Sequence, residues 1–158
     1  MDESHVSARV PSADEKSEIN SMLAAVELAS PDVDWKIYIP EKQYGVVIKL
    51  PYDCFITGTL NIGENEQNDI YIDMVSVNEK LRSNGIGPKL ERLLAEEAKK
   101  YGAVSLSGHI TSEEALSARM KAFEGSEIEF SDRATGKPLG SALNSDGKID
   151  CIAKIRLN

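Results

Sequence analysis

A strand, a turn and a helix follow one another around Val75-Ser-Val-Asn-Glu-Lys-Leu-Arg82-Ser-Asn-Gly85-Ile-Gly87. After the turn, apolar residues recur with the spacing of one helix face, at Leu90, Leu93, Leu94 and Ala98. A helix is therefore predicted to begin near Gly87. The first amides of a helix have no partners inside it and lie at the positive end of its dipole. The sequence thus predicts an anion site for phosphate groups in residues 82–87, named the 82–87 loop below.

Two glycines in this loop favour the close approach of a ligand. Because Gly85 and Gly87 lack a Cβ, the backbone can adopt angles that other residues avoid, and a diphosphate can approach the amides. Pro88 suits a first helical turn, where its missing N–H costs little. An ordinary turn with two glycines remains the alternative, since Gly-x-Gly alone is weak evidence. A dinucleotide fingerprint would need a third glycine, and a Walker loop would need Gly-Lys-Ser/Thr; neither pattern is present.

The rest of the chain combines helical and strand-like patterns. A capping box at residues 12–15 begins a helix that continues to about residue 29, and a second helical pattern covers residues 112–123. Strands are predicted at 35–39, 45–50, 54–62, 70–77, 104–109, 127–130 and 149–157. The strand at 70–77 is placed in the centre of the sheet because it is apolar on both faces. We expect one α+β domain over residues 1–158, with a short N-terminal end that is flexible.

Composition restricts the class of protein. The chain of 158 residues has a formal net charge of −8, which argues against nucleic acid and favours a cationic substrate or partner. The sequence contains no long apolar run and no signal peptide, so the cytoplasm is the expected compartment, without a membrane partner. In that compartment Cys54 and Cys151 are expected to be reduced thiols. Two cysteines in distant segments do not match metal-ligand spacing, so no metal is predicted.

Taken together, these features resemble the Gcn5-related N-acetyltransferase (GNAT) superfamily. Its hallmark, Arg/Gln-x-x-Gly-x-Gly/Ala after a strand, reads Arg82-Ser-Asn-Gly85-Ile-Gly87 here. Residues 6–19, with Arg9 and Asp14, resemble the first strand and helix of the family. Residues 104–109 resemble its fifth strand. The resemblance implies a three-layer α+β fold: a mixed, mostly antiparallel central sheet flanked by helices, with a splay between the fourth and fifth strands.

The resemblance also implies acetyl-CoA as cofactor, with CoA as product. The pyrophosphate would bind the amides of the loop residues Ser83, Asn84, Gly85, Ile86 and Gly87, with Arg82 shaping the loop. The pantetheine arm would pair with the backbone near Val75 and Val77, and amides near Val75 would polarise the thioester carbonyl. Pro88 stands where many relatives place a donor, so one phosphate contact is expected to be missing.

Acetyl transfer to an amine needs a group that accepts the amine proton. Asp73 is the first candidate, because it precedes Val77 by four residues on one strand and acidic residues recur there in some branches of the family. The structural alternative is an Asp that bonds to a neighbour or faces solvent. His109 is the second candidate, because it ends the fifth strand beside the expected splay and imidazoles titrate near neutral pH. A satisfied histidine at a strand end is its alternative.

The fourth helix departs from the family pattern. Many relatives have an Asn at its start and a later Tyr that protonates the CoA thiolate, where this chain has Ser112 and Arg119. Arginine cannot be that acid at neutral pH. Arg119 is expected on the surface of an amphipathic helix, and the alternative is that it binds a substrate carboxylate or the thiolate.

Two functions therefore stay open. One is direct N-acetylation of a primary amine on a small molecule or a protein, and a cationic acceptor is expected. The other is a weak or inactive GNAT-fold module that binds acyl-CoA or another protein. Relatives often dimerise through sheet edges, and residues 149–157 are expected to offer such an edge in a homodimer.

Overall fold

The computed structural model describes residues 10, 12–38 and 43–158, and its centre is one eight-stranded sheet. The strand order is β1-β2-β3-β4-β5-β8-β6-β7, and β4 and β5 form the parallel pair in an otherwise antiparallel sheet. The strands are β1 (Asp32–Tyr38), β2 (Gln43–Leu50), β3 (Cys54–Asn61), β4 (Asn68–Ser76), β5 (Ala103–Ile110), β6 (Ile128–Asp132), β7 (Pro138–Leu139) and β8 (Cys151–Arg156). The predicted mixed, mostly antiparallel α+β fold is confirmed.

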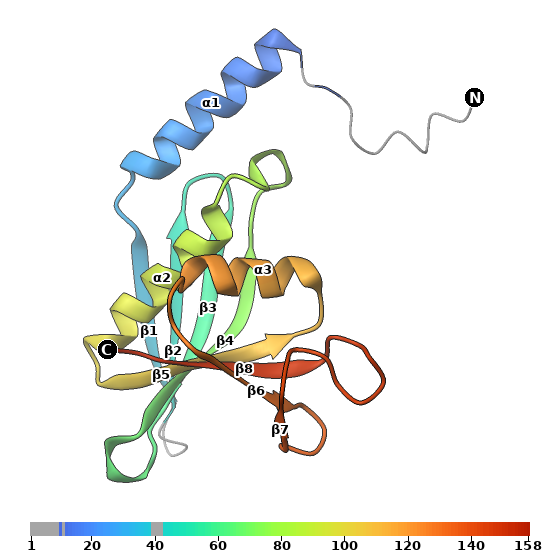
Figure 1. Cartoon of the computed structure of the whole chain (residues 1–158). Coiled ribbons are helices and arrows are strands. Elements are labelled where there is room, and N and C mark those ends of the chain that lie inside the picture. Colours follow the sequence, from blue (N-terminus) through green and yellow to red (C-terminus); the bar gives the residue numbers. More distant parts are fainter. Residues whose placement is uncertain (1–9, 11, 39–42) are drawn as a thin grey trace.

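Helices α2 (Ile86–Lys99) and α3 (Glu113–Ala122) lie side by side on one face of the sheet (Figure 1). The strands alternate, so every second side chain points toward these helices. The fully buried residues Ile56, Ile70 and Leu106 of three neighbouring strands pack in one core with Leu90 and Leu94 of α2. The carboxylate of Asp69 on the other face accepts hydrogen bonds from hydroxyls of β5. The two faces of the sheet therefore differ, one apolar and covered, the other with polar side chains.

Helix α1 (Ala13–Leu28) lies beyond the end of the strands rather than across the sheet (Figure 1). Ser12 caps it, because its Oγ accepts a hydrogen bond from the amide of Glu15 at 3.2 Å, as the capping-box pattern predicts. Met22 and Val26 anchor the helix in the core. An ion pair joins Glu18 to Lys80, in the short 3₁₀ helix η3 (Glu79–Leu81), at 3.3 Å. Helix α1 therefore packs beside the segment that leads into the 82–87 loop.

The last strand is not the sheet edge that the sequence analysis expects. Strand β8 lies between β5 and β6, so both of its sides are paired, and the prediction of an edge at residues 149–157 is wrong. The β6–β7 hairpin adds outside β8, a long-range pairing that strand patterns do not reveal. The edges of the described sheet are β1 and β7.

Three further expectations concern the cysteines, a membrane-spanning helix and the strand before α1. Cys54 and Cys151 are buried free thiols, and burial raises the pKa of Cys151. No helix in the described ranges is both long and apolar enough to cross a membrane. The predicted strand before α1, with Arg9 and the N-terminal end, lies outside the described residues.

Candidate functional site

The 82–87 loop follows η3 and turns the chain from β4 into α2. Ser83 and Gly85 both have left-handed backbone angles, with φ of 66° and 80°. The side-chain amide of Asn84 holds the turn from inside, because its Nδ2 donates to the carbonyls of Leu81 at 3.2 Å and Arg82 at 3.0 Å. Leu81 is fully buried and fixes the loop to the core. The loop is therefore a defined turn whose inner side is held by hydrogen bonds and by a buried side chain.

In the described chain the backbone amides of this loop are free, except that Arg82 N donates to Glu79 O at 3.5 Å. Within the described ranges, the amides of residues 83–87 donate no hydrogen bond, and the first helical bond runs from Lys89 N to Gly85 O at 3.1 Å. A Cβ built on Gly85 or Gly87 would meet no atom within 4 Å. Five consecutive amides without a partner among the described residues, with open space at the two glycines, thus stand at the positive end of α2, an arrangement that can receive phosphate groups. The helix begins at Ile86, beside the predicted Gly87.

Beside the loop, strands β4 and β5 separate. They pair in parallel up to Ile72 and Gly108. Beyond that point β4 pairs with β3 alone, Val75 lying opposite Ile56, whereas the end of β5 pairs with β8. A register shift in β4 leaves Asp73 between the paired residues Ile72 and Met74. The predicted splay is therefore present, and it begins at Asp73, directly after the last pair Ile72 and Gly108.

The splay exposes part of β4 where the sequence analysis places the pantetheine arm. Val75 is 37% exposed, and its side of the strand toward β5 has no strand partner among the described residues. Val77 lies just past the end of β4 and packs, half-buried, against the core. Free backbone groups at a strand edge can pair with an extended amide-containing ligand.

The two candidate proton acceptors lie at the two sides of the same opening. Asp73 follows Ile72, and His109 follows Gly108, the last pair before the strands diverge. The Oδ2 atom of Asp73 accepts a hydrogen bond from Thr59 Oγ1 at 2.6 Å on the face away from α2. His109 has a different partner, since its Nε2 lies 2.5 Å from Oδ1 of Asp150. The structure brings the candidates to one opening without joining them.

Arg119 is buried, which corrects the expectation of a surface position. Its side chain forms an ion pair with Glu91 of α2, and Nη1 donates to the carbonyl of Ala153 at 3.2 Å. Burial raises the pKa of Glu91, against the opposing effect of the Arg119 guanidinium. The cause is that α3 packs across α2, so one charged position of each helix faces inward. The sequence held one signal of this buried pair: Glu91 lies next to Leu90 on the apolar side of the α2 pattern.

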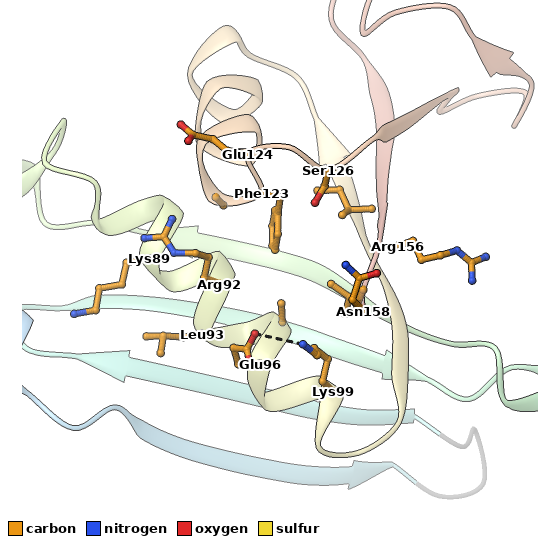
Figure 2. A pocket seen from close by; sticks show the side chains of 14 residues that line it. Lys89, Arg92, Leu93, Glu96, Lys99, Phe123, Glu124, Ser126, Arg156 and Asn158 are labelled. Atoms are coloured by element: carbon orange, nitrogen blue, oxygen red, sulfur yellow. Dashed lines mark ion pairs between the residues drawn. The ribbon is translucent and has the colours of Figure 1, made fainter.

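A groove of about 510 Å³ lies between α2, the end of α3 and the C-terminal residues (Figure 2). Four basic side chains line it, from Lys89, Arg92, Lys99 and Arg156. Lys99 pairs with Glu96 at 3.6 Å, and Glu124 contributes a second carboxylate. Figure 2 shows Phe123 pointing into the groove from the end of α3. The groove therefore gathers basic side chains beside α2 in a chain whose net charge is −8.

The site thus combines a parallel strand pair that splays with a glycine loop beside it, and comparison with known proteins gives the family. Residues 19–120 match the model of the acetyltransferase (GNAT) family. The chain belongs to this family, whose members use acetyl-CoA.

Solved structures share the fold at low sequence identity. An Agrobacterium tumefaciens crystal structure described as a putative acetyltransferase is 21% identical, with a TM-score of 0.50, and the match covers 99% of this chain and 100% of that one. A Bacillus subtilis acetyltransferase in complex with CoA is 16% identical, with a TM-score of 0.52, over 82% of this chain and 100% of that one. No curated protein matches the sequence.

Proposed function

We propose that this protein is an acetyl-CoA-dependent N-acetyltransferase that transfers the acetyl group directly to a primary amine of a small molecule or a protein. The observation that carries the proposal is the run of free amides at residues 83–87 beside the splay of β4 and β5. Membership in the GNAT family supports it.

The residues present fit the phosphate groups of CoA. Free amides, open space at Gly85 and Gly87 and the positive end of α2 form a cradle for the diphosphate. Arg82 is exposed at the start of the loop and offers a positive charge to these groups. The free edge of β4 near Val75 and Val77 can pair with the pantetheine amides.

The chemistry needs an acceptor for the amine proton. Acetyl-CoA supplies the acetyl group as a thioester when it is bound. An amine with a pKa near 10.4 is mostly protonated at neutral pH, and losing that proton costs about 4.6 kcal/mol. Asp73 and His109 stand at the opening and are the proposed proton acceptors. The exposed Asp73 carboxylate and the net charge of −8 favour a cationic acceptor.

A second candidate function is an acyl-CoA-binding or protein-interaction module with weak or absent catalysis. The sequence of α3, Glu113–Ala122, contains no tyrosine, and the Arg119 guanidinium is engaged with Glu91 and Ala153. The helix that supplies the thiolate-protonating acid in many relatives therefore offers no such acid. Water can protonate CoA thiolate, which leaves slow transfer open to this chain.

Two measurements separate the candidates. Purified protein is incubated with acetyl-CoA and spermidine, kanamycin or a lysine peptide, and thiol release and product mass are followed. Amine-dependent turnover supports the transferase. Calorimetric titration with CoA is done in parallel: binding without turnover favours the acyl-CoA module, whereas absent binding leaves only the protein-interaction alternative.

We also propose the cytoplasm as compartment and a homodimer as assembly. Because β8 is interior, such a dimer would have to use another surface, and β1 is the longer of the two edges. Size-exclusion chromatography with light scattering measures the assembly, and a clean monomer rejects the homodimer.

A further inference from the structure

The contact between His109 and Asp150 lies at the mouth of the splay. His109 is the first residue of β5 beyond the last pair with β4, and Asp150 immediately precedes β8. Nε2 of His109 lies 2.5 Å from Oδ1 of Asp150, and the two side chains are 30% and 43% exposed. Both groups are therefore close to the acetyl position that the splay defines, and both remain accessible to solvent.

The chemistry of this contact fixes the state of the imidazole. An ionised carboxylate only accepts hydrogen bonds, so the hydrogen lies on Nε2 of His109. The other ring nitrogen, Nδ1, then carries a lone pair in the neutral ring. A carboxylate that holds an imidazole in one tautomer also stabilises the imidazolium once a proton arrives. The pair is thus arranged to accept a proton at Nδ1.

Among the described residues, the groups around His109 leave its Nδ1 without a protein partner. Asp73 lies across the splay, and its Oδ2 is engaged by the hydroxyl of Thr59. On the adjoining strands, Lys154 of β8 and Glu129 of β6 lie opposite each other, and Lys154 pairs in register with Ser107, two residues before His109. No side chain in the described part of the chain bonds His109 besides Asp150. Its Nδ1 has no protein partner there.

We propose that Asp150 and His109 form a proton-accepting dyad for the acetyl transfer, with Asp150 as a positioning residue. This inference rests on the proposed function. The amine nitrogen bonds to the acetyl carbon while the carbon–sulfur bond breaks and its electron pair leaves with sulfur. The proton released by nitrogen moves to Nδ1 of His109 and then to water. Asp150 keeps its negative charge throughout.

A purely structural role for the contact would be to hold β5 and β8 together. Six residue pairs already join β5 and β8, from Ser105 to Ile110, so the strands do not need a clamp. An exposed ion pair contributes about 0–1 kcal/mol to stability. Stability measurements cannot therefore separate the two roles, and the test must follow catalysis and the imidazole itself.

The test compares His109→Gln, Asp150→Asn and Asp150→Glu with the matched control Asp146→Asn. Asp146 lies in the same segment and loses the same charge, but its side chain bonds no described residue. The amine of the panel above that turns over is used as acceptor. We expect His109→Gln to lower kcat roughly 10²–10⁴-fold and Asp150→Asn at least about tenfold, with KM for acetyl-CoA unchanged. The acid limb of the pH profile should move to lower pH in Asp150→Asn, and Asp150→Glu should restore part of kcat.

A second readout does not depend on turnover. In proton spectra of the full-length protein, the Nε2–H of His109 should show the downfield shift of a hydrogen bond to a carboxylate. Asp150→Asn should reduce that shift, because a neutral amide oxygen is a weaker acceptor, whereas Asp146→Asn should keep it. The dyad is rejected if Asp150→Asn matches Asp146→Asn in kcat, pH profile and Nε2–H shift. If wild type shows no turnover with any amine, the proposed function fails and the catalytic role fails with it, even where the spectra show the contact. The two failures are therefore distinguishable.

Discussion

Gly87 in the 82–87 loop and Gly108 at the base of the splay differ in the space beside them. A Cβ on Gly87 would meet no atom within 4 Å. A Cβ on Gly108 would lie 3.0 Å from Nη2 of Arg119 and 3.2 Å from Cβ of Ile72. The protein itself fills the space at Gly108, whereas nothing in the described chain uses the space at Gly87.

This difference separates a requirement of the fold from a requirement of binding. Gly108 lets the buried Arg119 guanidinium approach the backbone of β5, where α2, α3 and β8 also meet through Glu91 and Ala153. Gly87 has no positive φ and no close neighbour, so the fold would accept a side chain there. A glycine that the fold does not need, at the start of a helix with free amides, supports the proposed phosphate site.

The largest expected effect comes from breaking the buried pair at the base of the splay. Arg119→Ala leaves Glu91, which is 3% exposed, without its charge partner. Removing one member of a buried pair costs about 3–5 kcal/mol. Urea unfolding measures the loss, and Lys121→Ala, on the exposed side of the same helix, should stay near wild type.

The pH dependence of stability and a double variant test the same buried pair further. Burial already raises the pKa of Glu91 above its usual 4.5, and without Arg119 it should rise further. Folding then favours the protonated carboxyl, so Arg119→Ala should lose stability as the pH rises above 4.5 and regain it on acidification. Glu91→Leu with Arg119→Met should recover most of the loss, because two apolar groups replace both charges. A variant of unchanged stability at pH 7 would contradict the buried pair.

The loop should show the opposite behaviour, a loss of binding without a loss of stability. Gly87→Glu puts a carboxylate where the diphosphate is proposed to bind, and it should weaken CoA binding roughly a hundredfold, equivalent to about 2.7 kcal/mol. Gly140→Glu is the control, because a Cβ there also meets open space and its φ is not positive. Calorimetry with CoA and thermal unfolding are measured together. Equal CoA affinity in the two variants would reject the phosphate site.

Gly108→Ala tests the other side of the comparison with a smaller change. The added methyl group would press on Arg119 and on the side chain of Ile72, and overpacking of this kind costs about 1–3 kcal/mol. We expect Gly108→Ala to lower the unfolding free energy in the presence and absence of CoA alike. In the Arg119→Met background the cost should shrink, because the guanidinium is gone. An equal cost in both backgrounds would show that Ile72 alone sets it.

The local parts of this molecule could be predicted from the sequence. The 82–87 loop, the start of α2 and the cap at Ser12 depend on residues close in the chain, and each is present as expected. The splay also follows, through the resemblance to the GNAT family. The loop, the helix start and the cap could be predicted because their signals lie within one turn of the chain.

The long-range parts could not be predicted. The pair of Glu91 with Arg119 joins residues 28 positions apart, and His109 meets Asp150 across 41 positions. Each partner alone resembles a surface charge, so burial and pairing depend on how α3 and β8 pack. The interior place of β8 depends likewise on where the β6–β7 hairpin pairs.

The smallest effect distinguishes two glycines within the loop itself. Gly85 has a φ of 80°, in the left-handed region where an alanine is strained, whereas Gly87 does not. Gly85→Ala should therefore lower the unfolding free energy by about 1 kcal/mol, and Gly87→Ala should leave it unchanged or raise it slightly, as expected for alanine in a helix. Chemical unfolding of both variants measures this. If both lose stability equally, the fold needs Gly87 as well, and its open space no longer points to a ligand.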